Sequence, residues 1–322
     1  MSILISSETN VLIQGMTGKE GQKAAKAMLD YGINVVCGVT PKKGGQEVEG
    51  KPVFDTVREA LAVIASDEGA KQSPRQEENG EIAASPLAPR NDNWVAVVYV
   101  PPFAAKAAIL EAIENNIPLI NIFVERIPIK DTAYCLAAAK ERGVRIVGPS
   151  SLGLIVPDVG RIGVVGGPLV REIFQPGSIG VISRSGGMTN ELSWIIRQAG
   201  LGQSAAVHVG GDLLMGTTYA DVLRLFEKDE QTKAVIIFGE HGGSYEFEIV
   251  ELIKNKEFTK PLAIYIGGKF AQMLPEGMNI GHAGAIVARG QGATEKEAAL
   301  KAVGAMIADT YEELVKLVKP FV

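Results

Sequence analysis

Two series of short β-branched segments, each alternating with amphipathic stretches, run through most of this 322-residue chain. Such alternation, with short connections, predicts right-handed β-α-β units and a parallel sheet covered by helices, so we expect an α/β protein. In the first series the expected strands are 11–14, 34–39, 94–100, 119–123 and 144–147, and the expected helices are 18–31, 56–65, 102–115 and 131–142. In the second series the expected strands are 179–183, 204–209, 234–238 and 262–266, and the expected helices are 187–198, 219–227, 245–254, 294–305 and 311–317.

The boundary between the two series falls within residues 150–176. We therefore expect an N-terminal Rossmann-like domain over residues 1–150 and a flavodoxin-like, doubly wound domain over residues 151–322. Residues 67–93 interrupt the first series, because they are polar, rich in Pro and Asn, and without a clear period. We predict that this segment is an inserted surface loop and neither a domain nor a binding arm.

Charge and composition narrow the classes of function. The formal net charge is −5 and no block of Lys and Arg stands out, which argues against a nucleic-acid partner. No apolar run approaches the roughly 18 residues of a membrane-spanning helix, and the N-terminus lacks the features of a signal peptide. Cys37 and Cys135 have no metal-ligand spacing to another Cys or His. We therefore expect a cytoplasmic protein with no membrane contact, no disulfide framework and no metal site of its own.

The first expected strand runs into a glycine-rich turn, Gly15-Met-Thr-Gly18-Lys-Glu-Gly21, and then into a helix. Glycines there allow a sharp turn, so that backbone N–H groups at the helix start can face a phosphate. After the second strand an NAD site usually has Asp or Glu for the ribose, whereas this chain has Lys42 and Lys43. Two lysines suit a further phosphate on the ribose, as in coenzyme A or NADP. The alternative is that both are ordinary solvated lysines.

One of the three histidines, His282, lies in a segment of small residues, Gly281-His-Ala-Gly-Ala285, after an expected strand. A neutral imidazole with small neighbours can attack phosphorus when a carboxylate fixes its tautomer. Glu240, at the end of another expected strand, is a candidate for that carboxylate. The alternative is that His282 is a structural histidine in a loop.

Residues 183–189, Ser-Arg-Ser-Gly-Gly-Met-Thr, follow a strand and open a helix, so they are a candidate cradle for a phosphoryl group. These loops all follow strands, and open α/β sheets hold their ligands at the carboxyl ends of strands. We expect His208 and His241 to be structural, because both sit at strand ends without a dedicated partner.

Taken in order along the chain, these motifs resemble those of the α subunit of succinyl-CoA synthetase. The resemblance covers nearly the whole chain outside residues 67–93, and the combination of GHAGAI with an upstream GE-x-GG and SRSG is specific. The segments that carry it are 15–21, 39–45, 148–149, 183–189, 239–243 and 281–286. It implies a CoA-binding domain followed by a ligase domain. It also implies a separate β subunit with an ATP-grasp site for ATP or GTP and Mg²⁺, in a heterodimer or heterotetramer.

The resemblance also implies roles for individual residues. CoA binding falls to Thr17, Gly18, Lys19, Glu20, Lys43, Phe123, Val124 and Glu125. His282 matches the phosphorylated histidine and Glu240 its supporting carboxylate, while Ser185, Gly186 and Gly187 match the helix start that receives the phosphohistidine. The implied reaction phosphorylates His282, passes the phosphoryl group to a carboxylate, and releases it when the CoA thiol attacks.

Two departures bear on the substrate, a small carboxylic acid. The succinyl enzymes usually have GPNCPG where this chain has GPSSLG at residues 148–153, and SRSGTLTYE where it has SRSGGMTNE. The second change puts Asn190 in place of a substrate-side Tyr and is more similar to ATP-citrate lyase and citryl-CoA synthetase. Succinate, citrate and malate therefore stay open. Two other classes of function also stay open: a non-catalytic CoA-binding regulatory subunit, and an NADP-dependent oxidoreductase, for which no acid–base site is evident.

Overall fold

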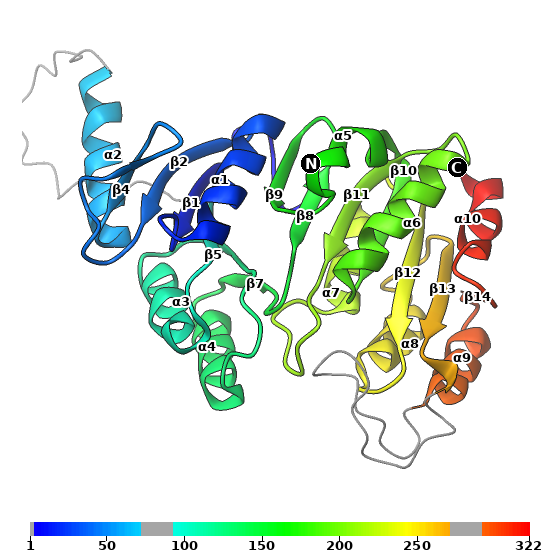
Figure 1. The fold of residues 1–322 in the computed structure, drawn as a ribbon. Coiled ribbons are helices and arrows are strands. Elements are labelled where there is room, and N and C mark those ends of the chain that lie inside the picture. Colours follow the sequence, from blue (N-terminus) through cyan, green and yellow to red (C-terminus); the bar gives the residue numbers. More distant parts are fainter. Residues whose placement is uncertain (1–2, 72–92, 271–291) are drawn as a thin grey trace, which may run out of the picture.

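The computed structural model describes residues 3–71, 93–270 and 292–322 and arranges them as two α/β units, each with a seven-stranded sheet (Figure 1). The fold class predicted from the sequence is confirmed. Among the described residues no helix is both long and apolar enough to cross a membrane.

The first sheet has the strand order β3-β4-β2-β1-β5-β6-β7, and its pairings are parallel except for the β3–β4 hairpin. Its strands are β1 (Asn10–Gln14), β2 (Asn34–Val39), β3 (Glu47–Val48), β4 (Lys51–Phe54), β5 (Trp94–Val98), β6 (Leu119–Ile122) and β7 (Arg145–Val147). Its helices are α1 (Lys19–Tyr31), α2 (Val57–Lys71), α3 (Ala105–Glu114) and α4 (Ile129–Glu141). Side chains alternate along β1: Leu12 packs with α2, α3 and α4, whereas Val11 and Ile13 pack with α1 on the other face.

The second sheet has the order β14-β13-β12-β10-β11-β8-β9, parallel up to β11 and antiparallel for β8 and β9. Its strands are β8 (Gly153–Val156), β9 (Gly160–Gly163), β10 (Pro176–Ser183), β11 (Gln203–His208), β12 (Ala234–Glu240), β13 (Leu262–Gly267) and β14 (Met306–Ile307). Its helices are α5 (Val170–Ile173), α6 (Gly186–Gln198), α7 (Tyr219–Lys228), α8 (Tyr245–Lys254), α9 (Ala293–Ala302) and α10 (Glu313–Val318). Helices α6 and α10 pack on one face, and α7, α8 and α9 on the other.

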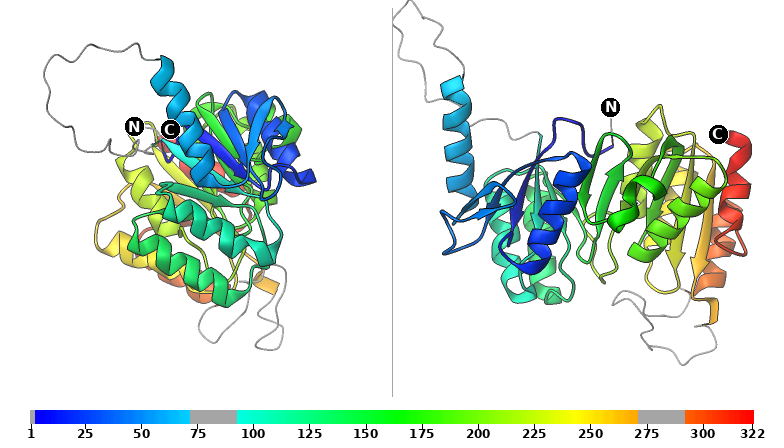
Figure 2. Two further views of the ribbon diagram at one scale, coloured as in Figure 1. Left: turned by 90° about the vertical axis from the view of Figure 1, so that its left-hand side faces the viewer. Right: turned by 45° about the horizontal axis from the view of Figure 1, so that its top comes forward.

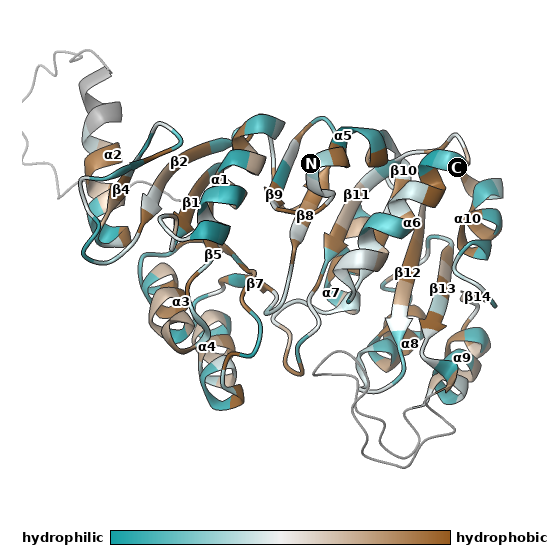
Figure 3. Ribbon diagram, viewed as in Figure 1, coloured by the Kyte–Doolittle hydropathy of each residue, from teal (hydrophilic) through white to brown (hydrophobic). Residues whose placement is uncertain are grey.

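Local chemistry explains where several helices begin and end. Helix α7 begins with a capping box, in which the Thr218 hydroxyl accepts from the Asp221 N–H and the Asp221 carboxylate accepts from the Thr218 N–H. Helix α1 ends at Gly32, whose left-handed φ of 101° suits a residue without a Cβ. The apolar strands and the polar outer sides of the helices separate clearly in Figure 3.

The two units share a continuous core. One apolar cluster contains Val11 of the first sheet, Leu154 and Ile162 of the β8–β9 hairpin, and Ile182 of the second sheet. Tyr31 adds polar links, because its hydroxyl accepts from the Asp158 N–H at 3.2 Å and its carbonyl accepts from Arg171 at 2.9 Å. The β8–β9 hairpin thus lies where the units meet, as Figure 1 and the right view of Figure 2 show.

The predicted helices and strands match the observed ones to within a few residues, with two corrections. Helix α2 continues to Lys71, so residues 67–71 are helical, and their assignment to an inserted loop was wrong. Residues 72–92 lie outside the described part of the chain. The sequence pattern also did not predict the short strands β3, β4, β8, β9 and β14.

Cys37 and Cys135 are both buried, and their thiols are free in this structure. Burial raises the pKa of the Cys37 thiol to about 12 and that of Cys135 to about 11. At neutral pH both thiols therefore stay protonated, and a protonated thiol is a poor nucleophile.

Replacement of Phe226 tests the packing of the second sheet. Phe226 is fully buried, and its ring lies against β10 so closely that a Cβ at Gly180 would come within 2.7 Å of it. We expect Phe226→Ala to lower the free energy of unfolding by about 3–5 kcal/mol. Phe103, which is 88% exposed, is the matched control, and Phe103→Ala should change it by less than about 0.5 kcal/mol. Equal effects in urea titrations of the two variants would contradict this packing.

Candidate active site

A cavity of about 520 Å³ opens at the carboxyl ends of β1, β2 and β5. It is lined by Gln14, Gly15, Thr17, Gly18, Val39, Thr40, Pro41, Tyr99, Val100, Pro101, Ala104, Ala107, Ala108 and Glu111. Its size suits a small-molecule ligand. The first unit therefore has a mostly apolar pocket at the edge where doubly wound sheets bind nucleotides.

The glycine-rich turn forms one wall of this cavity. Gly15 has a φ of +82°, and a Cβ there would lie 2.7 Å from the Tyr99 carbonyl oxygen. A Cβ at Gly21 would collide with the Gly15 carbonyl. Helix α1 starts at Gly18 without a side-chain cap on its first N–H groups. Phosphate binding by this helix start stays a prediction.

Two buried polar atoms of the cavity-lining residues fit a nucleotide-like ligand. Gln14 Nε2 donates to the Ala108 carbonyl at 2.8 Å, which fixes the amide orientation. Gln14 Oε1 and Thr40 Oγ1 are buried and have no hydrogen-bond partner among the described residues. A ligand with donor groups would satisfy both atoms, and the adenosine portion of CoA carries such groups.

Some of the residues expected to bind CoA line the cavity, and others lie outside it. Thr17 and Gly18 line the cavity, while Lys19 and Glu20 lie exposed on the first turn of α1. Lys43 is exposed in the β2–β3 loop, where its N–H donates to the Asp55 carboxylate at 2.9 Å.

The other three expected residues follow β6. Phe123 stacks on Tyr99, a cavity residue, with ring centroids 4.6 Å apart. Val124 is buried, and Glu125 is exposed beside Arg126. This segment therefore adjoins the cavity through the Phe123–Tyr99 stack without forming its wall.

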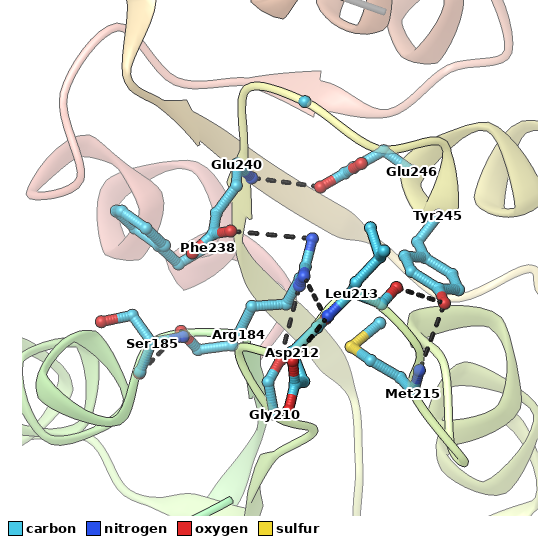
Figure 4. Close-up of polar contacts among 12 residues, drawn as sticks. Arg184, Ser185, Gly210, Asp212, Leu213, Met215, Phe238, Glu240, Tyr245 and Glu246 are labelled. Carbon is cyan, nitrogen blue, oxygen red and sulfur yellow. Dashed lines mark hydrogen bonds and ion pairs between the residues drawn. The ribbon is translucent and has the colours of Figure 1, made fainter. Parts of the chain in front are cut away.

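A second polar cluster lies at the carboxyl ends of β10, β11 and β12 and is organised around Arg184 (Figure 4). The Arg184 side chain is fully buried. It donates to the Asp212 carbonyl at 2.8 Å and the Gly210 carbonyl at 3.4 Å, and its Nη1 lies 3.6 Å from Glu240 Oε2. The structure thus brings Glu240, a predicted site residue, against a buried cation that the sequence analysis did not single out.

The start of α6 lies next to this cluster. Ser185 is the N-cap, and its hydroxyl accepts from the Met188 N–H at 3.4 Å. Gly187 at the first turn is exposed, and only the Ser185 hydroxyl lies near its hypothetical Cβ. The predicted cradle of Ser185, Gly186 and Gly187 is therefore a helix N-terminus adjacent to the Arg184–Glu240 pair, a setting that favours an anion.

His208 has two partners, so the expectation that it lacks one was wrong. The Leu152 N–H donates to His208 Nδ1 at 2.7 Å, and His208 Nε2 lies 2.8 Å from the Arg184 carbonyl. Because Nδ1 accepts, the proton must be on Nε2, and the ring is a neutral link between strands. His241 is buried, and its backbone N–H donates to the Gly267 carbonyl.

Three further charged residues near Glu240 were missed by sequence reasoning. Asp212 is 9% exposed, and burial raises the pKa of its carboxyl, while a hydrogen bond from the Leu213 N–H opposes that shift. Lys296 and Glu246 form a fully buried ion pair of 2.6 Å. Burial lowers the pKa of Lys296, and the Glu246 carboxylate opposes this. Arg184 differs from these three residues, because it lies within residues 183–189, which the sequence analysis identified as a candidate phosphate cradle.

The last two predicted site residues are Asn190 and His282. Asn190 is half-buried, and its side-chain oxygen accepts from the Gly166 N–H at 2.9 Å, so it holds the turn before α5. Its contact with substrate stays a prediction. His282 lies outside the described residues, between β13 and α9 in the sequence. The described residues contain no group of three or more metal-ligating side chains.

Comparison with known proteins agrees with this division of the chain. Residues 6–71 match the "CoA binding domain" family, and residues 182–311 match the "CoA-ligase" family. The "Succinate--CoA ligase [ADP-forming] subunit alpha 2" of Archaeoglobus fulgidus is 39% identical over 320 residues, which is 99% of each chain. An "ADP-forming sulfoacetate-CoA ligase subunit" of Acholeplasma is 38% identical over 320 residues, 99% of this chain and 98% of the other.

Among solved structures, ATP citrate lyase from Methanosaeta concilii superposes with a TM-score of 0.84 at 22% identity. The match covers 99% of this chain but 50% of the citrate lyase chain. At this identity the likeness establishes the fold alone.

The CoA-binding unit, joined to a ligase unit, defines a subunit of an acid–thiol ligase. The chain belongs to the succinyl-CoA synthetase α-subunit family.

Removal of the Arg184 guanidinium tests the cluster. Arg184→Met leaves the buried Glu240 carboxylate without this cation, so we expect the free energy of unfolding to fall by about 3–5 kcal/mol. Urea titration followed by fluorescence of Trp194, which lies on α6 in the same unit, measures it.

Arg224 supplies the matched control, since its half-exposed side chain pairs with Glu257 at 2.8 Å. Arg224→Met should cost less than about 1 kcal/mol. A loss from Arg184→Met as small as that of the control would contradict the role assigned to the buried pair.

Proposed function

We propose that this chain is the phosphohistidine-bearing α subunit of an ADP-forming ligase that joins CoA to a small acid with a second anionic group. Residues 1–150 would bind CoA and residues 151–322 would carry out phosphoryl transfer. The names of the relatives support this choice of acid, because succinate and sulfoacetate both pair a carboxylate with a second anion.

The observation that carries the proposal is the contact between Arg184 and Glu240 beside the Ser185 N-cap. A carboxylate supports an imidazole nucleophile, and a helix N-terminus stabilises the phosphoryl group on it. A purely CoA-binding protein would need neither, so this site favours a ligase over a regulatory subunit.

In the proposed reaction His282 accepts the γ-phosphoryl group of a nucleoside triphosphate while Glu240 holds its imidazole. Ser185, Gly186 and Gly187 then offset the charge of the phosphoryl group as it passes to the acid's carboxylate. The CoA thiol displaces phosphate and forms the thioester. The covalent intermediate divides one difficult step into easier ones.

The remaining parts of the assembly are proposed by family likeness. A β subunit of the ATP-grasp type would hold ATP or GTP and Mg²⁺, in a cytoplasmic heterodimer or heterotetramer. Succinate is our first choice of acid, because several relatives at 38–40% identity carry that name. The SRSGGMTN segment with Asn190 keeps citrate and malate as alternatives.

Thioester formation by the complex with its β subunit tests the proposal. The complex is incubated with ATP, CoA and, in separate reactions, succinate, sulfoacetate, citrate and malate, and acyl-CoA is detected by mass spectrometry. We expect ADP and one dominant CoA thioester, from succinate or sulfoacetate. Acetate, which lacks the second anion, is the matched control acid.

CoA binding without a thioester from any acid would overturn the ligase proposal and leave a regulatory subunit. Acetate used as well as succinate would overturn the choice of substrate class alone.

A further inference from the structure

Lys296 of α9 and Glu246 of α8 form an ion pair in the second unit in which both side chains are 0% exposed. Their charged atoms lie 2.6 Å apart. Burying two charges is expensive, and an apolar pair of similar size often gives equal or greater stability. Stability alone therefore does not explain this pair, whose two side chains also make hydrogen bonds to the backbone.

Those contacts converge on the backbone of Glu240. Lys296 Nζ donates to the Glu240 carbonyl and to the Gly242 carbonyl, both at 2.7 Å. The second oxygen of Glu246, Oε1, accepts from the Glu240 N–H at 3.1 Å, as Figure 4 shows. The pair thus holds both main-chain polar groups of Glu240, at the point where β12 ends.

The opposite side of Glu240 is fixed by Arg184, whose Nη1 lies 3.6 Å from Glu240 Oε2. Arg184 is itself held by the Gly210 and Asp212 carbonyls. With the backbone anchored by the buried pair, the carboxylate has little freedom to leave this position. Catalytic groups need such restraint, because small displacements reduce rates strongly.

Lys296 also has a particular place in the chain. It lies in the first turn of α9, the helix that follows the segment carrying His282. The same ammonium group therefore ties the first turn of α9 to the Glu240 loop. A buried ammonium group has three N–H donors to satisfy, and in Lys296 two of them go to carbonyls of this one loop.

We infer that Lys296 and Glu246 are positioning residues that hold the Glu240 carboxylate where His282 is phosphorylated. This inference rests on the proposed function.

Two neutral double variants, studied in the complex with its β subunit, test the inference. Lys296→Met/Glu246→Leu removes the contacts of both side chains to the Glu240 backbone and leaves no buried charge behind. Lys296→Met/Glu246→Gln is also neutral, but its Gln oxygen can still accept from the Glu240 N–H. Steady-state kcat, the KM for CoA and thermal unfolding are measured for each.

We expect the Met/Leu variant to lose kcat by about tenfold to a hundredfold. The KM for CoA should not change, because the CoA cavity belongs to the first unit. The Met/Gln variant should recover part of the lost kcat. Glu257→Gln, which alters an exposed pair of the same unit, is the matched control and should keep full activity.

A Met/Leu variant with wild-type kcat would overturn the inference. So would a kcat that falls only in proportion to the folded fraction seen in thermal unfolding. A wild-type complex that forms no thioester would instead refute the proposed function, so the two failures are distinguishable.

Discussion

A buried guanidinium group needs hydrogen-bond acceptors and a counter-charge within the protein, and Arg184 finds them on the loop after β11 and at the end of β12. It reaches the carbonyls of residues 210 and 212 after β11 and the carboxylate of Glu240 at the end of β12. Its own carbonyl is bound by the ring of His208. Because a buried charge left unpaired costs several kcal/mol, these three strand ends are fixed relative to one another. The helix start at Ser185 inherits that fixed position, since it follows Arg184 directly.

The two units divide the chemistry between them. The first offers a mostly apolar cavity beside a glycine-rich turn, and the second offers a cation, a carboxylate and a helix N-terminus. Thioester formation needs the CoA thiol to meet an activated acid in a defined orientation. The shared core through Val11, Leu154 and Ile182 gives the units a common rigid base. The Phe123–Tyr99 stack joins the cavity residue Tyr99 to the segment that follows β6.

Much of this arrangement was predictable, because strand–helix alternation and glycine-rich turns are local patterns. The strand ends at Ser183 and Glu240 were found in this way. The β8–β9 hairpin was not, because its strands begin or end at Gly153, Gly160 and Gly163, and glycine is depleted in strands. Lys296 and Glu246 could not be found at all, because lysine and glutamate in a helical stretch normally indicate a solvated face. His208 shows the same limit, because its partners Leu152 and Arg184 are distant in sequence. The antiparallel pairing of β8 with β11 brings Leu152 to the ring, and the parallel pairing of β10 with β11 brings Arg184 to it.

Labelling with γ-labelled ATP tests directly whether a histidine of this chain carries the phosphoryl group. The complex with its β subunit is labelled as wild type, as His282→Asn and as the matched control His241→Asn. We expect an acid-labile, base-stable label on this chain that is lost only in His282→Asn. Label that persists in His282→Asn, or a CoA-binding wild-type complex that takes up none, would contradict it.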